Sequence, residues 1–320
     1  MSRWESSASV ADRFTGCLLG LAVGDAIGGP YEGLTAADIY FQFGTPEVIV
    51  RNPSGETLYF TDDTEMMIGV AETLIECGSI EEARLCHAFV ENYHPDRGYG
   101  QGARKVLNAM ARDKDWRKIT ATLFPGGSFG NGAAMRVAPV GLLFREQHEL
   151  LWQQAKLSAL PTHTHPLGIE GAQLLALAIA HASQVTTFDR RVFYRDLLDR
   201  TTTEEFRWHL GIAAQLKRTD SVSGLGSTLH AHRSVVTAIA CFAATPTDFE
   251  FAVGRAIGLG DDTDTLAAMT GALVGAFAGQ AAIPEARIVQ LEEQGKGGKY
   301  IADLAKCLYA RYASSGAIRP

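Results

Sequence analysis

The sequence lacks the long apolar runs and the ordered cysteine spacing that mark membrane and secreted proteins. No run of 18 apolar residues occurs, and the N-terminal stretch MSRWESSASVADRF has no apolar signal segment. The five cysteines are scattered without CxxC spacing, which favours reduced thiols over a disulfide framework. We therefore expect a soluble, cytoplasmic protein that has no membrane partner.

Runs of basic residues are also missing. The net charge is −7, which argues against general nucleic-acid binding. At 320 residues, 46% of them hydrophobic, the chain can bury a full core, and no low-complexity linker interrupts it. We expect a single domain over residues 1–320. The sequence does not decide the oligomeric state, for which a monomer is the expectation.

Helical periodicity, by contrast, runs through almost the whole chain. Apolar residues recur at helical spacing in nine segments: 14–27, 64–77, 80–93, 168–182, 204–216, 234–244, 249–258, 266–278 and 299–312. A further helix is predicted over 133–144, and only 48–60 indicates a strand or an extended loop. The pattern predicts an all-α fold.

Glycine is unusually frequent for a helical protein, at 33 residues. Since Gly in a helix interior costs about 0.5–1 kcal/mol relative to Ala, these residues need a reason. Two segments have glycine at every fourth position: Gly16, Gly20, Gly24 and Gly28 in the first, and Gly271, Gly275 and Gly279 in the second. Small residues on one face let two helix backbones pack closely. Such packing would bring Asp25 near the later of two acidic clusters.

These acidic clusters, Thr61-Asp62-Asp63-Thr64 and Asp261-Asp262-Thr263-Asp264-Thr265, lie about 200 residues apart, each before a predicted helix. Helix capping is the ordinary explanation of either cluster alone, but a cap needs one oxygen and each cluster supplies several. Carboxylates and hydroxyls suit Mg²⁺, Mn²⁺ or Ca²⁺, whereas zinc calls for His and Cys. An EF-hand is excluded, because its later positions hold Leu266, Ala267 and Leu273. We interpret the clusters as two halves of one binuclear metal site.

A glycine-rich turn, 126–132, offers backbone amides of the kind that hold phosphate oxygens, although a plain loop is an equal alternative. It matches neither GxGxxG nor a P-loop, which argues against nucleoside triphosphate chemistry. His163 and His165 follow without the third His or Cys that a zinc site needs. Hydrogen bonding to a ligand or to the backbone is their expected role.

Taken together, these motifs resemble the ADP-ribosylglycohydrolase family in order and spacing. The resemblance is carried by Gly24-Asp25-Ala26-Ile27-Gly28, Glu32, 59–64, 130–136, Thr162-His163 and 260–265. It implies an orthogonal multi-helix bundle around a central site for two Mg²⁺ or Mn²⁺ ions. It also implies a hydrolase whose partners are ADP-ribosylated proteins or small molecules that contain ADP-ribose.

Within the family, the stretch GSFGNGAAMRVAP is most similar to the ADP-ribosylhydrolase 3 branch. That branch acts on serine-linked ADP-ribose, poly(ADP-ribose) and O-acetyl-ADP-ribose. The arginine-specific branch, which includes the dinitrogenase reductase activating glycohydrolase, is the alternative.

The resemblance also implies a role for each matching residue. The metal ligands would be Thr61, Asp62, Asp63, Asp262, Asp264 and Thr265. Glu32 would be the catalytic residue, through acid/base chemistry. The substrate would be bound by Asp25, Phe124, Gly127, Ser128, Phe129, Gly130, Asn131 and His163. Two positions depart from the family pattern: Asp261 stands where the family has Gly, and Phe124 matches the adenine-stacking aromatic only loosely.

Two hypotheses from other classes are weaker. The run Asp62-Asp63-Thr64-Glu65 is similar to the aspartate-rich motif of terpene synthases, but Met66 replaces the last acid and no second motif follows. A non-catalytic ADP-ribose binder would be expected to lose metal ligands, yet the whole set is present together with Glu32. An enzyme is therefore favoured.

Overall fold

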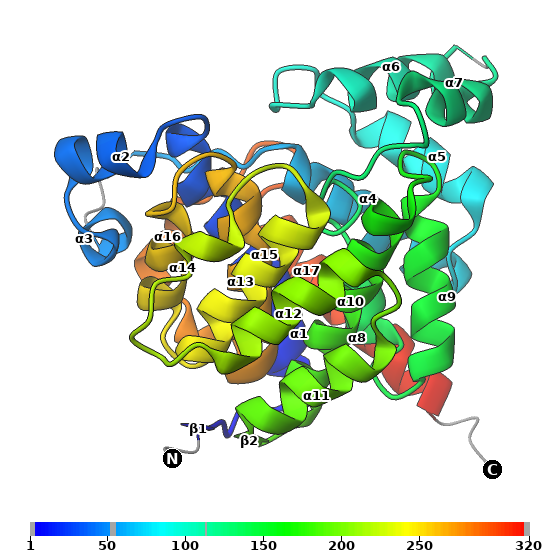
Figure 1. Cartoon of the computed structure of the whole chain (residues 1–320). Helices are drawn as coiled ribbons and strands as arrows, with labels where there is room; N and C mark the ends of the chain where they lie inside the picture. The colour runs from blue at the N-terminus through cyan, green and yellow to red at the C-terminus, as the bar shows by residue number, and fades with distance from the viewer. Residues whose placement is uncertain (1–3, 52–55, 113, 317–320) are drawn as a thin grey trace.

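The computed structural model describes residues 4–51, 56–112 and 114–316, and nearly all regular structure in these ranges is helical (Figure 1). The α-helices are α1 (Val10–Gly28), α2 (Ala36–Phe43), α3 (Pro46–Arg51), α4 (Asp62–Cys77), α5 (Glu82–Asn92), α6 (Gln101–Met110), α7 (Trp116–Leu123), α8 (Ala138–Leu143), α9 (His148–Ala159), α10 (Pro166–Gln184), α11 (Arg190–Arg200), α12 (Glu204–Gln215), α13 (Ala231–Ala244), α14 (Phe249–Ile257), α15 (Thr263–Ala278), α16 (Glu285–Gln290) and α17 (Gly298–Gly316). Short 3₁₀ turns occupy η1 (Gly29–Tyr31), η2 (Ser223–Leu225) and η3 (Gln280–Ala282). Two strands, β1 (Trp4–Glu5) and β2 (Thr187–Phe188), form a small antiparallel pair. The all-α prediction is confirmed.

All nine segments with helical periodicity contain a helix, but the helix predicted over 133–144 begins only at Ala138. The reason lies in the preceding turn. The backbone N–H groups of Ala134 and Met135 both donate to the Asn131 carbonyl, at 2.7 and 3.0 Å, which closes a turn rather than a helix. The residues after the glycine-rich segment therefore form a compact corner.

The segment 48–60 was expected to be extended, and its first part is not. The backbone N–H groups of Val48 and Ile49 donate to the Thr45 carbonyl at 2.9 and 3.2 Å, so this part belongs to helix α3. Residues 52–55 lie outside the described ranges. Leu58 is extended as predicted and forms an isolated parallel bridge with Leu291.

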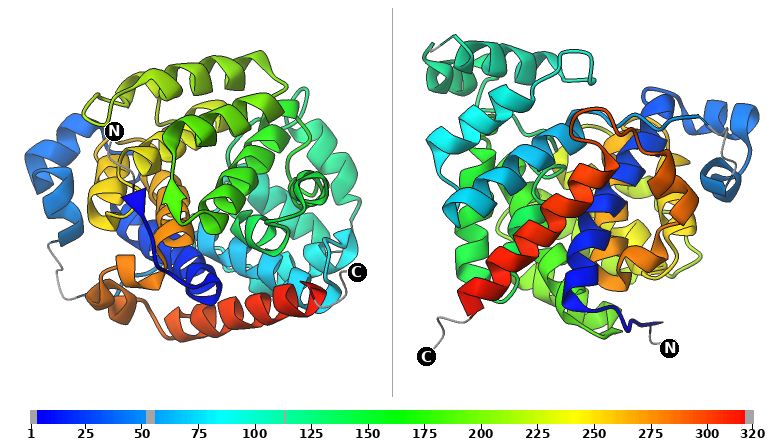
Figure 2. Two further views of the ribbon diagram at one scale, coloured as in Figure 1. Left: turned by 90° about the horizontal axis from the view of Figure 1, so that it is seen from below. Right: turned by 180° about the vertical axis from the view of Figure 1, so that it is seen from behind.

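Helices α1 and α15 form the centre of the molecule, and α1 is buried from Arg13 to Gly28 (Figures 1 and 2). The two glycine stripes face each other, as predicted. A Cβ atom on Gly275 would lie 1.9 Å from the Gly16 carbonyl oxygen, and one on Gly271 would lie 2.1 Å from that of Gly20. Only glycine permits this backbone approach at both positions.

The remaining helices surround this central pair. Helix α17 crosses α1, where Phe14 contacts the rings of Tyr309 and Tyr312 with centroids 5.5 Å apart in each case (Figure 2). Helices α2 and α3 project at the left of the view in Figure 1, and α6 and α7 project at its upper right. Among the described helices, none has both the length and the apolarity that a membrane span requires.

Candidate active site

The two acidic clusters meet beside the C-terminal end of α1. One stands at the start of α4 and the other at the start of α15. The Thr61 hydroxyl lies 3.4 Å from Asp264 Oδ2, and the Thr265 hydroxyl lies 3.4 Å from Asp63 Oδ1. Two segments that are remote in sequence thus form one polar cluster, which we call the acidic site.

Close packing of α1 against α15 sets the position of the later cluster. A Cβ atom on Gly28 would lie 2.6 Å from the Asp264 Cα atom, so a larger residue would push the cluster away. The Thr263 hydroxyl also donates to the Gly28 carbonyl at 2.9 Å. The glycine stripe therefore positions Asp264 as well as the helix that carries it.

Asp25 holds the earlier cluster in place. Its carboxylate accepts hydrogen bonds from the backbone N–H groups of Thr61, at 3.0 Å, and Thr64, at 3.1 Å, and from the Thr64 hydroxyl at 2.5 Å. Asp25 is fully buried, and burial together with the nearby charge of Asp264 raises the pKa of its carboxyl to about 7. Its predicted contact with substrate remains a prediction, whereas its contacts here fix the N-terminus of α4.

Capping accounts for only part of the acidic residues. Thr61 is the N-cap of α4, and its hydroxyl accepts from the Asp63 N–H at 3.4 Å. Asp262 is the N-cap of α15 but makes no side-chain capping bond. Capping therefore explains the position of Thr61 but not the number of carboxylates gathered here.

The geometry of these oxygens fits a divalent cation. Carboxylate oxygens of Glu32, Asp262 and Asp264 all lie within 4.8 Å of one another. Since metal–oxygen bonds are about 2.0–2.6 Å long, ligands of one ion can be roughly 4–5 Å apart. In addition, Asp63 Oδ2 is buried and has no hydrogen-bond partner among the described residues. A buried carboxylate oxygen without a partner is costly unless a cation compensates it.

The electrostatics of the acidic site point the same way. Burial, followed by the charge of Asp264, raises the pKa values of Asp62, Asp63 and Asp262 well above their usual range. Burial also raises the pKa of Asp264 itself. Carboxylates packed this closely repel one another when ionised, and a divalent ion would offset that repulsion.

Glu32 reaches the acidic site from the loop that follows η1. Burial and the charge of Asp264 raise its pKa, although the residue is exposed at the surface. The loop is tied down next to it, because the Gly33 N–H donates to the Asp261 carbonyl at 2.8 Å and the Asp261 N–H donates to the Leu34 carbonyl at 2.9 Å. Glu32 is therefore held beside Asp262 and Asp264 by a paired backbone segment.

The glycine-rich turn packs against the segment that leads into α13. The Asn131 N–H donates to the Leu229 carbonyl at 2.9 Å, and the Ala231 N–H donates to the Phe129 carbonyl at 3.1 Å. The Asn131 side chain then donates to Asp262 Oδ2 at 2.5 Å and to the Ser234 hydroxyl at 3.0 Å. Asn131 thus joins the turn to the acidic site.

The aromatic and histidine side chains around the turn have different environments. Phe129 is 42% exposed, and one face of its ring stacks on His230 with centroids 5.1 Å apart. His163 is buried beneath the turn, where its ring approaches Gly130 and Gly132 and its Nδ1 lies 2.7 Å from the Thr162 hydroxyl. Burial, and to a lesser extent the charge of Arg136, lower the pKa of His163 to about 3, so it is neutral at physiological pH.

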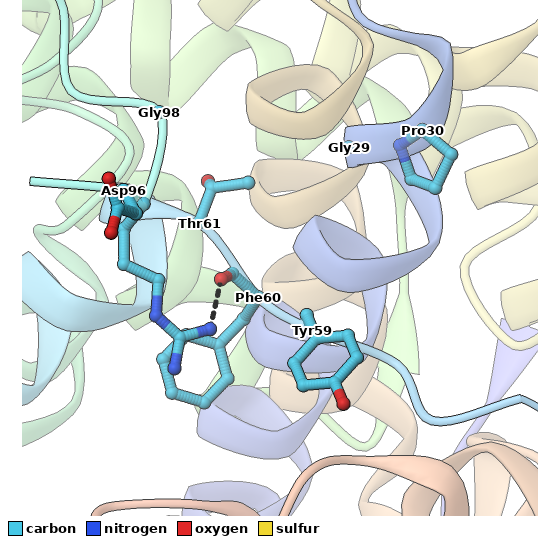
Figure 3. Close-up of a pocket in the computed structure, with 8 residues that line it drawn as sticks. Gly29, Pro30, Tyr59, Phe60, Thr61, Asp96 and Gly98 are labelled. Atoms are coloured by element: carbon cyan, nitrogen blue, oxygen red, sulfur yellow. Dashed lines mark hydrogen bonds between the residues drawn. The ribbon is translucent and has the colours of Figure 1, made fainter. Parts of the chain in front are cut away.

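A cavity of about 470 Å³ opens next to the acidic site (Figure 3). The segment Tyr59 to Thr61 forms its middle, with Asp96 and Gly98 on one side and Pro30 on the other. Thr61 belongs to both the cavity and the acidic site. Space for a ligand therefore adjoins the carboxylates.

The sequence profile of the family described as ADP-ribosylglycohydrolase matches residues 6–317 of this chain. The chain belongs to the ADP-ribosylglycohydrolase family. It is 33% identical to ADP-ribosylhydrolase ARH3 of Mus musculus, over 88% of this chain and 87% of that protein. It is 32% identical to ADP-ribosylhydrolase ARH3 of Danio rerio, over 94% of this chain and 90% of that protein. A solved structure, the ADP-ribosylglycohydrolase-related protein complex, superposes with a TM-score of 0.74 at 25% identity and covers 95% of this chain and 99% of its own.

Asp261, which was expected to stand where the family has Gly, has an unusual backbone conformation. Asp261 has φ 62°, the only positive φ of a non-glycine residue among those described. Asp is one of the few residues besides Gly that adopt this left-handed conformation readily. Its carboxylate accepts a hydrogen bond from the Ser227 hydroxyl at 2.7 Å, which stabilises the turn. Asp261 therefore adopts a conformation that usually favours glycine.

Phe124, the loosely matching aromatic, is 44% exposed and lies against Gly102 of α6. Its carbonyl accepts from the Gly127 N–H at 2.9 Å. Gly127 has φ 91°, and a Cβ there would lie 2.3 Å from the Thr164 hydroxyl oxygen. The turn thus needs glycine at this position, while an adenine contact for Phe124 remains a prediction.

Sequence reasoning missed three residues of this ADP-ribosylglycohydrolase site. Ser227 holds Asp261, Ser234 holds Asn131 and His230 supports Phe129. All three come from 227–234, a segment that the fold brings to the acidic site. No spacing or composition in that segment signals the role, because each residue acts through a contact to a distant part of the chain.

Proposed function

We propose that this protein is a divalent-metal-dependent hydrolase that releases ADP-ribose by cleaving the glycosidic bond at the anomeric carbon of the distal ribose. Its proposed substrates are serine-linked ADP-ribose, poly(ADP-ribose) and O-acetyl-ADP-ribose. The observation that carries the proposal is the meeting of the two acidic clusters at a Thr61 to Asp264 distance of 3.4 Å. Similarity to ADP-ribosylhydrolase ARH3 over most of both chains supports the class of substrate.

Six side chains would hold two Mg²⁺ or Mn²⁺ ions: Thr61, Asp62, Asp63, Asp262, Asp264 and Thr265. They offer only carboxylate and hydroxyl oxygens, the donors that these ions prefer. When bound, such ions polarise substrate oxygens and lower the pKa of a bound water. Asp25 and Asn131 would not bind the ions themselves but would position residues that do. Asp25 fixes the backbone of Thr61, and Asn131 orients Asp262 through its hydrogen bond of 2.5 Å.

Glu32 would move the proton that the reaction needs. Breaking the glycosidic bond leaves a negative oxygen on the leaving group, and a carboxylic acid close to the anomeric carbon can protonate it while water adds to the ribose. Glu32 is suited to this because its carboxylate lies within 4.8 Å of those of Asp262 and Asp264 yet remains exposed on a loop. A ligand seated on the acidic site would touch it.

The other end of ADP-ribose would lie along the glycine-rich turn. Ser128 would present its backbone amide to the pyrophosphate, while the N–H groups of Gly127 and Gly130 hold the turn through the Phe124 carbonyl and the Ser128 hydroxyl. The half-exposed ring of Phe129 would offer a stacking surface for adenine. His230 stacks on one face of this ring and would hold it in place. His163, neutral and buried, would support the turn from beneath.

A side-by-side assay tests the proposal. Protein stripped of metal with EDTA is given serine-linked, arginine-linked or polymeric ADP-ribose, with and without added Mg²⁺, and released ADP-ribose is measured by mass spectrometry. We expect release from the serine-linked and polymeric substrates only when Mg²⁺ is present. Faster release from the arginine-linked substrate would assign the protein to the arginine-specific branch. Binding of ADP-ribose without any turnover would indicate a non-catalytic relative.

A further inference from the structure

A second cavity lies at the opposite end of the α1–α15 pair from the acidic site. Its volume is about 1030 Å³, and Phe188 in its wall contacts Phe277 near the C-terminus of α15 with centroids 5.8 Å apart. At a rise of about 1.5 Å per residue, Asp264 and Phe277 are separated by roughly 20 Å along the helix. The cavity is therefore distinct from the space described above. We call it the basic cavity.

The charge of its lining contrasts with that of the whole protein. Six basic residues and two acidic ones line it, in a chain whose net charge is −7. The basic residues are Arg190, Arg191, Arg195, Lys217, Arg218 and Arg255, and the acidic residues are Asp189 and Asp199. A concentration of one sign of charge around a concave surface attracts ligands of the opposite sign.

Two of these guanidinium groups are held by neutral partners, whereas that of Arg195 is paired with Asp196 at 2.9 Å. Arg190 donates to the Ala213 carbonyl at 2.5 Å, and Arg255 donates to the Arg218 carbonyl at 3.0 Å and to the carbonyl of Asp220. Within the described part of the chain, neither group has a carboxylate at ion-pair distance. Hydrogen bonds to carbonyl oxygens position the guanidinium planes without neutralising their charge, which leaves them able to bind an anion.

The floor of the basic cavity is apolar. Ala240, Ala243 and Ala244 of α13 and the ring of Phe188 are buried there, with Leu198, Leu216 and Val222 beside them. Tyr194 also lines the cavity, and the Arg190 guanidinium lies over its ring at 5.0 Å from the centroid. An apolar floor with a cationic rim suits a ligand that has an apolar body and an acidic group. The volume is close to that of pockets for small molecules, about 300–1,000 Å³.

We propose that the basic cavity binds a small organic anion, with its apolar ring or chain on the α13 floor and its acidic group among the arginines. The proposal does not depend on the function of the acidic site. Arg191 and Lys217 are exposed, so their charges can be removed with little risk to folding.

Fluorescence titration of the full chain with anilinonaphthalene sulfonate tests this, with saturating ADP-ribose and Mg²⁺ present to fill the acidic site. The double variant Arg191→Gln/Lys217→Gln should weaken dye binding by about fivefold, as expected for the loss of two exposed charge contacts. The matched control Lys156→Gln/Lys306→Gln removes two exposed charges elsewhere and should leave the affinity unchanged.

Phenylnaphthylamine, which has the same rings but no sulfonate, serves as the neutral probe and should bind more weakly than the sulfonate dye. Equal dye affinity in the two double variants would overturn the proposal. So would equally tight binding of the neutral probe, or a dye affinity that is clearly weaker with saturating ADP-ribose than in a parallel titration without it.

Discussion

Asp264 is the carboxylate on which the two halves of the acidic site converge. Its oxygens contact Thr61 from one cluster and lie near those of Glu32 and Asp262. Its charge also contributes to the raised pKa values of Asp25, Asp62 and Asp63. At the scale of single residues, carboxylates that are chemically alike thus have different proposed roles, and substitutions can separate these roles.

Asp264→Ala should abolish turnover while leaving a folded protein. We expect kcat to fall by at least about 10³-fold, because a proposed metal ligand is lost. Removing one of several buried carboxylates also relieves repulsion, so the melting temperature without metal should hold or rise. Asp62→Ala should behave in the same way.

Release of ADP-ribose in saturating Mg²⁺ and differential scanning fluorimetry in EDTA provide the two readouts. Asp303→Asn, an exposed carboxylate on α17, is the control and should leave both unchanged. Full activity of Asp264→Ala at ordinary Mg²⁺ concentrations would contradict its assignment as a ligand.

Glu32→Gln should separate proton transfer from binding. The amide keeps the size of the side chain but loses the acid, so kcat should fall by roughly 10²–10⁴. The affinity for ADP-ribose should change little, because a group that acts only in the transition state does not contribute to ground-state binding. Calorimetric titration of ADP-ribose with Mg²⁺ present measures this. A collapse of affinity together with rate would make Glu32 a binding residue and direct the search for the acid to Asp25 and Asp261.

His163 should make the protein less stable at mildly acidic pH. Its pKa is lowered to about 3 in the folded state, below its ordinary value of 6.5, so the unfolded chain binds the extra proton first as the pH falls. The stability from neutral His163 is complete above pH 6.5 and is lost progressively below it. Between pH 7 and pH 5 the loss should be about 2 kcal/mol. Urea denaturation should show that His163→Gln lacks this part of the pH dependence, whereas a substitution of exposed His87 retains it.

At the scale of elements, the α1–α15 contact links packing to chemistry. The same glycine stripe that lets the helices touch at Gly20 and Gly271 also places Gly28 against Asp264. A change near the middle of the helix pair is therefore expected to affect both stability and the acidic site.

Gly271→Ala should destabilise the protein by about 3 kcal/mol, because the new Cβ would lie 2.1 Å from the Gly20 carbonyl oxygen and force the helices apart. The melting temperature should drop by roughly 4–5 °C for a chain of 320 residues. Gly211→Ala is the matched control, since Gly211 lies in α12 with no atom within 4 Å of its would-be Cβ. It should gain about 0.5–1 kcal/mol from better helix propensity. Equal melting temperatures for the two variants would show that the close approach contributes nothing.

Long, strongly apolar helices were predicted from the sequence, and the helices that were missed are short or polar. Helices α1, α10 and α15 are buried along most of their length and have an unmistakable apolar content. Helix α11, by contrast, reads RRVFYRDLLDR and buries only three of its residues, so its periodicity is hidden by charge. Its stability depends on tertiary contacts that periodicity does not contain.

The candidate site likewise has a part that could be predicted from the sequence and a part that could not. The acidic clusters were recognisable because each concentrates unusual residues over a few positions, and the structure brings them together. Contacts such as Ser227 with Asp261, or His230 with Phe129, join single ordinary residues from distant segments. Such pairs depend on how the helices pack, and no local sequence pattern predicts them.

At the scale of the whole molecule, the central helix pair separates two cavities of opposite character. The acidic site and its adjoining cavity lie at one end of α1, and the basic cavity lies at the other. Because the distance between them exceeds the Debye length of about 8 Å at physiological ionic strength, charge changes in one should have little effect on ligand binding in the other.

The central claim is that two acidic clusters build one divalent-metal site. The most direct measurement is anomalous diffraction from crystals of the protein soaked in Mn²⁺. Our account predicts two Mn²⁺ peaks about 3.5–4 Å apart, between Thr61, Asp62 and Asp63 on one side and Asp262, Asp264 and Thr265 on the other. Absence of any peak at this position in millimolar Mn²⁺, or ordered Mn²⁺ only at other sites, would contradict it.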